Sequence, residues 1–385
     1  MMEESMAKQE LAKEYIPQAD YLSNAANLFF LPFYQATYQL VDQCCIDLAI
    51  EAFQQLDETI IQLCDRTMVS DHRAYTATTI VDLLNEEGLI TFSNGKNWEP
   101  YQHERWKQAD CLSRCQQGIQ QFPQSRGMFE LIALAREGII DFLQAKKTGL
   151  DVLFPKDKAS VWYRYNNDNA IIQVYAKLVA AAIQSIADEK PGLRLLEVGA
   201  GTGASTAEIL NSTCEQIDDY LYTDLGVSFL RQGQARFEQY PFMRYQRLDI
   251  NHTLLEQGID AESMDIVLAM NVVHTATDIE MTLRYLKTVL KPGGWLVLGE
   301  GSPLSAKKRW RPDIVFGLLQ GWWDVKLSPH RPRPGFLLPN EWCRLLEDTQ
   351  FTLVNHFPGE AAFGEQACYG GVVMGRKNDT TVIDK

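Results

Sequence analysis

Apolar positions change their spacing along the chain, and the change separates two kinds of structure. Between residue 21 and about residue 150 they recur at helical spacing, for example at Leu40, Cys44 and Leu48. After Leu193, short apolar runs alternate with amphipathic stretches. A period near 3.6 residues predicts helices, and a regular alternation of strands and helices predicts a doubly wound parallel sheet. We therefore expect a mainly helical region followed by an α/β domain.

The expected domain boundaries follow shifts in composition. Residues 1–20 are polar and predict a flexible N-terminus, residues 21–155 predict a helical lid domain, and residues 156–385 predict the α/β core. A connector over residues 156–169 opens the core, and residues 171–187 predict an apolar helix after it. An insertion at about 301–340 separates the fifth predicted strand from the last two.

Within the helical region, residues 76–100 differ from their surroundings. Residues 79–88 predict a helix with a glycine cap, and residues 89–98 predict a hairpin with Asn94 and Gly95 at its turn. This winged-helix-like unit holds one basic residue and four acidic ones between 76 and 100, which is unfavourable for DNA binding. A lid or an oligomerisation element is the interpretation that we favour.

Seven segments of the C-terminal half are predicted to be strands of one sheet. They cover residues 193–198, 220–224, 243–249, 264–270, 295–300, 351–357 and 368–376. Residues 278–290 predict a helix, and residues 291–294 predict the turn before the fifth strand. The expected fold is an α/β protein with a seven-stranded, doubly wound, Rossmann-like sheet and a helical N-terminal lid.

The first of these strands runs into the most informative motif of the chain, E-V-G-A-G-T-G at residues 197–203. Glycines let a ligand approach the backbone of a turn because they have no Cβ atom. Their spacing differs from the dinucleotide motif G-x-G-x-x-G, and the Lys-Ser/Thr of a phosphate loop is missing. Glu197 ends the strand, where a carboxylate would repel a pyrophosphate but attract an ammonium group.

Polar residues also end the next three predicted strands. Asp224 ends the second strand, Asp249 the third, and Asn271 follows the fourth. Ligands of doubly wound sheets bind beyond the carboxyl ends of the strands. A carboxylate at the position of Asp224 can accept two hydrogen bonds from a ribose diol, and Asp249 can accept the amino group of an adenine.

A histidine and a glutamate follow neighbouring predicted strands. His274 comes after the fourth strand, and Glu300 ends the fifth. Adjacent parallel strands bring such groups within hydrogen-bonding reach. A carboxylate on one imidazole nitrogen fixes the tautomer and raises the basicity of the other nitrogen. The pair is therefore a candidate general base with its orienting partner.

These motifs together resemble a known family. The glycine stretch resembles motif I of the class I S-adenosylmethionine (SAM) methyltransferases. The segments N-V-V-H-T-A-T at 271–277, L-K-P-G-G at 290–294, V-L-G-E at 297–300 and V-F-G-L-L-Q-G-W-W-D at 315–324 are similar to the C-methyltransferase domains of polyketide synthases. The resemblance runs from about residue 150 to residue 376. Whether the chain is a free-standing relative or an excised domain stays open.

The resemblance implies a function. Those domains methylate the α-carbon of a β-ketoacyl chain that an acyl carrier protein holds on its phosphopantetheine arm, and they convert SAM into S-adenosylhomocysteine without a metal. The histidine is their base, which implies His274 here, and Glu300 is implied as its partner. The implied SAM ligands are Glu197, Gly199, Gly201, Gly203, Asp224, Leu225, Asp249, Ile250 and Asn271. Other polyketide synthase domains are implied as further partners.

Two further groups of residues lie in and around the insertion. Among the candidate substrate residues, Phe316, Trp322 and Trp323 of the insertion could roof an acyl pocket or simply pack as core. Tyr163 and Tyr165 of the connector could close over the cofactor. Residues 306–333 contain seven Lys or Arg against two acids, within a chain of net charge −14. Their first members are the expected docking site for an acidic carrier, although a solvated basic turn would have the same composition: Lys307, Lys308, Arg309 and Arg311.

Composition argues against several classes of partner and site, namely nucleic acids, membranes, disulfides and metals. A net charge of −14 argues against nonspecific nucleic-acid binding. No apolar run is expected to span a membrane, and the N-terminal residues lack the apolar core of a signal peptide. Eight scattered cysteines predict free thiols in a reducing, cytoplasmic compartment, and Cys111 and Cys115 lack a second pair at zinc spacing, so no metal site is expected.

Two other functions remain open from the residues alone. An O-methyltransferase for a small hydroxylated natural product would also combine a helical region with a histidine base. A catalytically inactive SAM-fold scaffold would need none of these side chains. The Gly-Trp-Trp segment and Glu300 favour carbon as the methyl acceptor, and the joint presence of the glycines, Asp224, His274 and Glu300 argues against a scaffold.

Overall fold

The computed structural model describes residues 27–65, 71–93, 97–100, 104–303, 305, 308–359 and 369–378. The chain divides into two compact units. The first, which we call the core unit, contains Met1–Leu31, Gln173–Ser302 and Lys326–Lys385. The second, the helical unit, contains Pro32–Ile172 and Pro303–Val325. The predicted flexible N-terminus, residues 1–20, lies outside the described residues.

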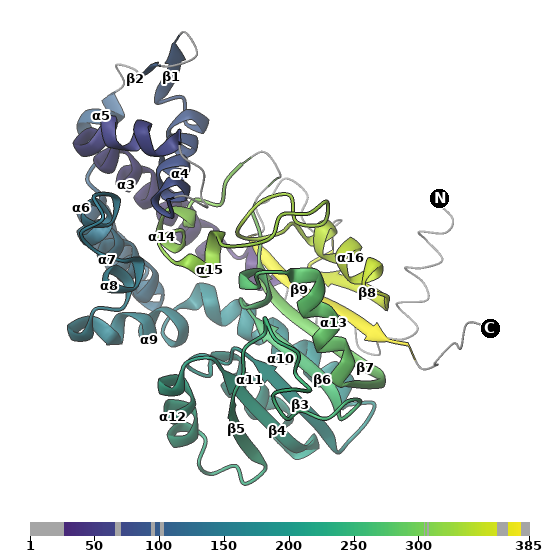
Figure 1. Ribbon diagram of the computed structural model, residues 1–385. Coiled ribbons are helices and arrows are strands. Elements are labelled where there is room, and N and C mark those ends of the chain that lie inside the picture. The colour runs from purple at the N-terminus through teal and green to yellow at the C-terminus, as the bar shows by residue number, and fades with distance from the viewer. Residues whose placement is uncertain are drawn as a thin grey trace. The chain divides into compact units, whose positions relative to one another are not determined.

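The core unit is built on a seven-stranded sheet (Figure 1). Its strands are β3 (Leu193–Val198), β4 (Ile217–Asp224), β5 (Met243–Arg247), β6 (Met264–Met270), β7 (Leu290–Gly301), β8 (Phe351–Phe357) and β9 (Gly370–Lys377). They follow the order β5-β4-β3-β6-β7-β9-β8, and only β9 runs antiparallel to its neighbours. The predicted seven-stranded doubly wound sheet is confirmed. Because β3 and β6 are adjacent and β6 pairs with β7, the glycine turn and the ends of the two strands implicated in catalysis meet at one edge.

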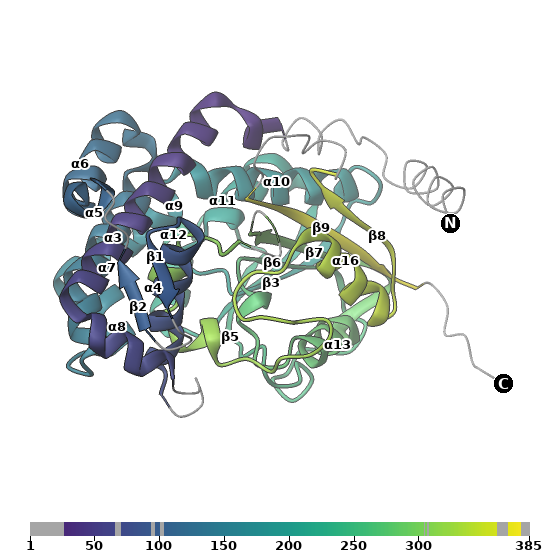
Figure 2. The same ribbon diagram turned by 90° about the horizontal axis from the view of Figure 1, so that it is seen from above.

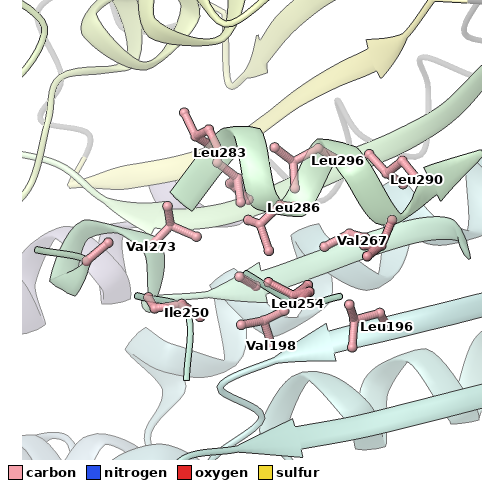
Figure 3. Close-up of a cluster of buried hydrophobic side chains, with 14 of the residues drawn as sticks. Leu196, Val198, Ile250, Leu254, Val267, Val273, Leu283, Leu286, Leu290 and Leu296 are labelled. Carbon is pink, nitrogen blue, oxygen red and sulfur yellow. The ribbon is translucent and has the colours of Figure 1, made fainter. Parts of the chain in front are cut away.

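Helices cover both faces of this sheet (Figure 2). They are α10 (Ala170–Ala187), α11 (Ala204–Thr213), α12 (Val227–Arg236), α13 (Ile279–Val289) and α16 (Pro339–Asp348), with the 3₁₀ turns η1 (Asn27–Phe30), η4 (Cys214–Gln216) and η5 (Val273–Thr275). Figure 3 shows Leu283 and Leu286 of α13 in the same buried cluster as Val267 and Leu296 of the sheet. All four side chains are fully buried, which explains the apolar runs within β6 and β7.

The apolar helix predicted at 171–187 is α10, and it is more apolar than expected. Among the helices that the structure describes, α10 is long and apolar enough to span a membrane by length and composition alone. Its 18 residues have a mean hydropathy of 1.6, and 67% of them are buried inside the protein. Its buried face packs within the core unit: Tyr175 Oη donates to the carbonyl of Tyr369 at 2.7 Å, and Val179 lies against Gly299. Packing on the sheet therefore accounts for the apolar run.

Short elements and helices make up the helical unit. They are α3 (Pro32–Cys64), α4 (Arg73–Glu86), β1 (Ile90–Ser93), β2 (Asn97–Pro100), α5 (Glu104–Gln108), α6 (Cys111–Gln121), η2 (Pro123–Ser125), α7 (Arg126–Leu143), α8 (Gly149–Leu153), η3 (Lys156–Lys158), α9 (Ala159–Asn167), α14 (Asp313–Phe316) and α15 (Gln320–Trp323). The antiparallel pair β1 and β2 follows α4 directly, so the predicted helix and hairpin are present. The predicted turn at Asn94 and Gly95 lies outside the described residues.

Two sequence-based expectations need correction. The predicted connector over 156–169 is mostly the helix α9, because its aromatic side chains find partners: Trp162 packs on Phe154 with ring centroids 4.7 Å apart. The insertion at 301–340 was expected to belong wholly to the core, yet Pro303–Val325 belongs to the helical unit. Arg309 and Arg311 pair with carboxylates of α4 and hold this segment there.

The predicted turn at 291–294 is also modified. It lies inside β7, whose pairing with β6 passes from Met264 and Leu290 to Ile266 and Trp295. The residues between these pairs bulge out of the ladder, and Gly293 has a φ of 75° there. A bulge of this kind still bends the strand, so the local expectation of a bend is correct although the strand continues.

Candidate active site

The glycine turn links β3 to α11 and uses its three glycines in different ways. Gly199, Gly201 and Gly203 all have positive φ values, of 64°, 57° and 78°. A Cβ atom on Gly199 would lie 2.5 Å from Val272, and one on Gly203 would lie 2.6 Å from Phe237, so these two permit close packing. At Gly201 the nearest described atom would be a backbone oxygen 3.9 Å away. Gly201 therefore leaves its backbone open to a ligand.

Glu197 has a different role from the predicted one. Its carboxylate is 1% exposed and accepts hydrogen bonds from the hydroxyls of Ser205, Thr206 and Tyr220, at 2.5 Å from Thr206 and 2.7 Å from Tyr220. Burial raises its pKa, and these hydroxyls oppose the rise. The carboxylate is thus used to join β3, β4 and α11 beneath the turn. The expectation that it receives an ammonium group is not supported by this geometry.

Asp224, at the end of β4, holds the glycine turn from the other side. One oxygen accepts the amide of Gly201 at 2.9 Å, and the other accepts the amide of Gly226 at 2.7 Å. Burial raises the pKa of Asp224, and these backbone amides oppose the rise. A carboxylate has further lone pairs beyond the two used here. An open glycine backbone beside such a carboxylate fits a ribose-bearing ligand such as SAM.

The residues predicted to lie around the adenine differ in how accessible they are to a ligand. Asp249 is half-buried and accepts the amide of Asn251 at 3.0 Å. Ile250 is buried in the hydrophobic cluster beneath the sheet edge, so its side chain serves packing. Leu225 is 53% exposed. Asp249 and Leu225 thus remain accessible to a ligand, whereas Ile250 contributes mainly to the core.

Asn271 joins the ends of β6 and β7. It has a φ of 55°, a conformation that asparagine tolerates better than most residues. Its amide donates to the carbonyl of Gly299 at 2.7 Å, and its side-chain oxygen accepts the amide of Gly301 at 3.0 Å. The residue therefore fixes the spacing of the two strand ends that carry His274 and Glu300.

His274 and Glu300 meet as the strand order predicts. His274 Nδ1 lies 2.6 Å from Glu300 Oε2, and the two side chains are 3% and 1% exposed. The other carboxylate oxygen accepts the amide of Val273 at 3.0 Å. When Nδ1 carries the proton and donates a hydrogen bond to Glu300, Nε2 bears the lone pair of the neutral ring. The geometry thus suits a general base with a fixed tautomer.

Two residues beside this pair were missed from sequence. The ring of Phe336 makes a T-shaped contact with the imidazole of His274, with centroids 4.5 Å apart. Arg331 is buried and donates to the carbonyl of His274. Both lie in the second half of the insertion: Arg331 within the proline-rich segment S-P-H-R-P-R-P-G at 328–335, and Phe336 directly after it. This stretch has neither periodicity nor a motif to mark them.

Most of the predicted substrate aromatics are packed inside the helical unit. Phe316 and Trp322 stack with centroids 5.3 Å apart, and Tyr165 packs on Phe316 at 5.6 Å. All three are under 8% exposed. Core packing, the alternative left open by the sequence for Phe316 and Trp322, therefore describes all three. Tyr163 is 42% exposed, and Trp323 is half-buried against the ring of His72, so these two keep accessible surface.

The basic residues of the insertion divide in the same way. Arg309 pairs with Asp82 at 2.6 Å, and Arg311 pairs with Glu86 at 2.5 Å and with Glu87 at 2.7 Å. These ion pairs fold the insertion onto α4, which contradicts the use of both arginines as carrier contacts. Lys308 is exposed, and Lys307 lies outside the described residues.

The described cysteines and the possible metal ligands are further candidates for a second reactive group or a metal site. The cysteines within the described residues are free thiols, and burial raises the pKa of Cys45 well above its usual range. In the part of the chain that the structure describes, His, Cys, Asp and Glu side chains do not gather in groups of three that could hold a metal ion.

Comparisons with known proteins agree with this fold. A family model described as a methyltransferase domain matches residues 196–296. The chain is 32% identical over 251 residues to the polyketide synthase PksM of Bacillus subtilis (strain 168). This match covers 62% of this chain and 6% of PksM. The chain spans between 6% and 10% of the length of the curated polyketide synthases that it matches.

Two solved structures extend the likeness over nearly the whole chain. The DszA carbon methyltransferase superposes with a TM-score of 0.79 at 25% identity, covering 94% of this chain and 97% of that one. The trans-methyltransferase CalH, solved in complex with S-adenosylhomocysteine, superposes with a TM-score of 0.67 at 23% identity, covering 89% and 91%. The chain therefore contains a SAM-dependent methyltransferase domain with the class I fold, and it is similar over nearly its whole length to a carbon methyltransferase.

Proposed function

We propose that the chain methylates the α-carbon of a β-ketoacyl thioester that an acyl carrier protein presents on its phosphopantetheine arm. The observation that supports this most directly is the buried pair of His274 and Glu300, 2.6 Å apart at the ends of β6 and β7. A carbon between a ketone and a thioester is acidic enough for an oriented imidazole to deprotonate it. The similarity to a carbon methyltransferase supports carbon as the methyl acceptor.

The protein's own contribution is binding, orientation and removal of one proton. SAM, when bound, supplies the electrophilic methyl group. In the proposed reaction the α-carbon proton passes to Nε2 of His274, and Glu300 stabilises the imidazolium through Nδ1. Gly201, Asp224 and Asp249 would hold the cofactor. Orientation of the two reactants also lowers the barrier, because it replaces a bimolecular encounter.

The first experiment tests the acceptor atom. The full chain is incubated with SAM and a β-ketoacyl pantetheine, and separately with a matched β-hydroxyacyl pantetheine and a phenol. We expect the β-ketoacyl thioester alone to gain one methylene in mass, with the new group at the α-carbon by fragmentation. Methylation of oxygen in either control would favour the O-methyltransferase alternative, and no methylation with retained SAM binding would favour a scaffold.

A second prediction concerns docking of the carrier. Arg309 and Arg311 are engaged in ion pairs, so the exposed Lys308 and its neighbour Lys307 are the remaining candidates. The double variant Lys307→Glu/Lys308→Glu should slow methylation of carrier-bound substrate and spare the free pantetheine analogue. The difference should shrink at high salt, because exposed charges are screened beyond a Debye length of about 8–10 Å.

A charge-matched control accompanies that measurement. The pair Lys146 and Lys147 follows α7, in another part of the helical unit, and its reversal to Glu changes the net charge by the same amount. Equal slowing by both double variants would point to net charge alone. Equal slowing of both substrates would mean that Lys307 and Lys308 act on the reaction and not on docking.

Partners and compartment follow from the same proposal. The curated relatives are large synthases, so other polyketide synthase domains are expected neighbours of this enzyme. We keep the cytoplasm as the expected compartment, since the free thiols are consistent with a reducing environment.

A further inference from the structure

A buried arginine lies behind the loop that carries His274. Arg331 is 0% exposed, although arginine is almost never fully buried unless its donors are paired. It lies in the proline-rich segment 328–335, where the chain has just returned from the helical unit to the core unit. No motif of the sequence uses this residue, so its burial has to be explained by its contacts.

The guanidinium of Arg331 binds the backbone at the end of η5. Nη1 donates to the carbonyl of Ala276 at 2.6 Å, and Nη2 donates to the carbonyl of His274. Carbonyl groups at the C-terminal end of a helical turn lack partners within the turn, and burying them unpaired is unfavourable. One planar side chain therefore satisfies the carbonyl of the histidine and the carbonyl two residues after it.

The segment that carries Arg331 is itself anchored in the core unit. Ser328 and Arg331 exchange backbone hydrogen bonds of 3.0 Å in both directions. The hydroxyl of Ser328 donates to Glu280 of α13 at 2.9 Å. Phe336, five residues after Arg331, contacts the imidazole of His274. Backbone and ring of the histidine are thus held by the same short stretch of chain.

We infer that Arg331 is a positioning residue for His274. Glu300 fixes the ring through Nδ1, and Arg331 fixes the backbone of η5 from which that ring projects, so the two together define where Nε2 points. The inference rests on the proposed function, because positioning matters to the rate only when His274 is the base. A misplacement of about 1 Å in a reacting group can lower a rate by about 10²-fold.

The test compares three variants of the full chain. Arg331→Met removes the N–H donors but keeps most of the volume, and Arg331→Lys keeps the charge. Arg333→Met is the matched control, because Arg333 lies two residues away and pairs instead with Glu341, at 2.7 Å. Each variant is examined for the downfield NMR signal of the His274 Nδ1 proton, for SAM affinity, and for solvent-deuterium exchange at the α-carbon of a β-ketoacyl pantetheine without SAM.

We expect Arg331→Met to lose or shift the Nδ1 signal and to slow deuterium exchange by about 10²-fold, with SAM affinity unchanged. Arg331→Lys should fall between it and the wild type, and Arg333→Met should behave as the wild type. Wild-type signal and exchange in a folded Arg331→Met would overturn the inference. So would a parallel loss of signal, SAM binding and thermal stability, which indicates a general folding role. Should Arg331→Met not fold, Arg331→Lys decides by the same criteria.

Failure of the proposed function would have a different signature. If His274→Ala kept wild-type deuterium exchange, His274 would not be the base. The NMR signal of the ligand-free protein requires no substrate, so in that case it would still report whether Arg331 positions the histidine against Glu300. The two hypotheses are therefore tested separately.

Discussion

Replacement of His274 by alanine is expected to lower methyl transfer by about 10²- to 10⁴-fold, the usual contribution of a positioned general base. SAM binding should stay nearly normal, because the glycine turn and Asp224 belong to β3 and β4 and not to the strand that carries the histidine. Single-turnover rates on a β-ketoacyl pantetheine and calorimetry with SAM measure the two effects. Wild-type turnover in His274→Ala would require another base.

Glu300→Gln tests the second member of the pair. The carboxylate of Glu300 receives His274 Nδ1 on one oxygen and the amide of Val273 on the other. A glutamine has a single acceptor oxygen, so it can satisfy only one of these donors and stabilises the imidazolium less. We expect a partial loss of activity, smaller than that of His274→Ala. His356→Ala, which removes a histidine of β8, is the matched control and should keep full activity.

Substitutions at Gly201 and Asp224 should abolish or strongly weaken SAM binding. A valine at Gly201 would occupy the open space above the turn, and Asp224→Ala would remove an acceptor from the ribose hydroxyls. Each hydrogen bond to a charged group contributes about 1.5–3 kcal/mol, so a loss of two corresponds to a large drop in affinity. Calorimetry with SAM measures the effect, and unchanged affinity in both variants would remove the cofactor assignment.

The structure adds a cost in stability to both changes. Gly201 has a φ of 57°, where a branched side chain is strained, and Asp224 holds the amides of Gly201 and Gly226. Gly88→Val is the matched control, because Gly88 has a φ of 65° and no described atom within 4 Å of an added Cβ. A loss of SAM affinity at Gly201 beyond the loss of thermal stability at Gly88 isolates the effect on the ligand.

Interactions that are local in sequence could be predicted well. Apolar runs bounded by glycines and polar residues give the strands, and parallel strands bring their carboxyl ends to one edge. That rule is sufficient to place His274 near Glu300 and Asp224 near Gly201, because each pair follows neighbouring strands. The glycine spacing and the residue types at these ends then indicate the cofactor and the base.

Side-chain hydrogen bonds and ion pairs between distant segments could not be predicted in this way. Whether Glu197 faces an ammonium group or three hydroxyls depends on where Tyr220 and the first turn of α11 lie around it. Whether Arg309 is a docking residue or an anchor depends on Asp82, which is remote in sequence. The sequence gives the charge of a side chain but not the partner of that side chain. It therefore cannot distinguish a residue that binds a ligand or a partner protein from one that forms an internal ion pair.

The sequence by itself therefore determined the class of fold, the glycine turn and the pairing of His274 with Glu300, since periodicity marks the strands and consecutive strands such as β6 and β7 usually lie side by side. Only the tertiary structure decided that 303–325 belongs to the helical unit, that Phe316 and Trp322 pack as core, and that Arg331 supports the histidine loop. Those outcomes rest on burial and on hydrogen bonds between distant segments, which become favourable only when the whole chain has folded.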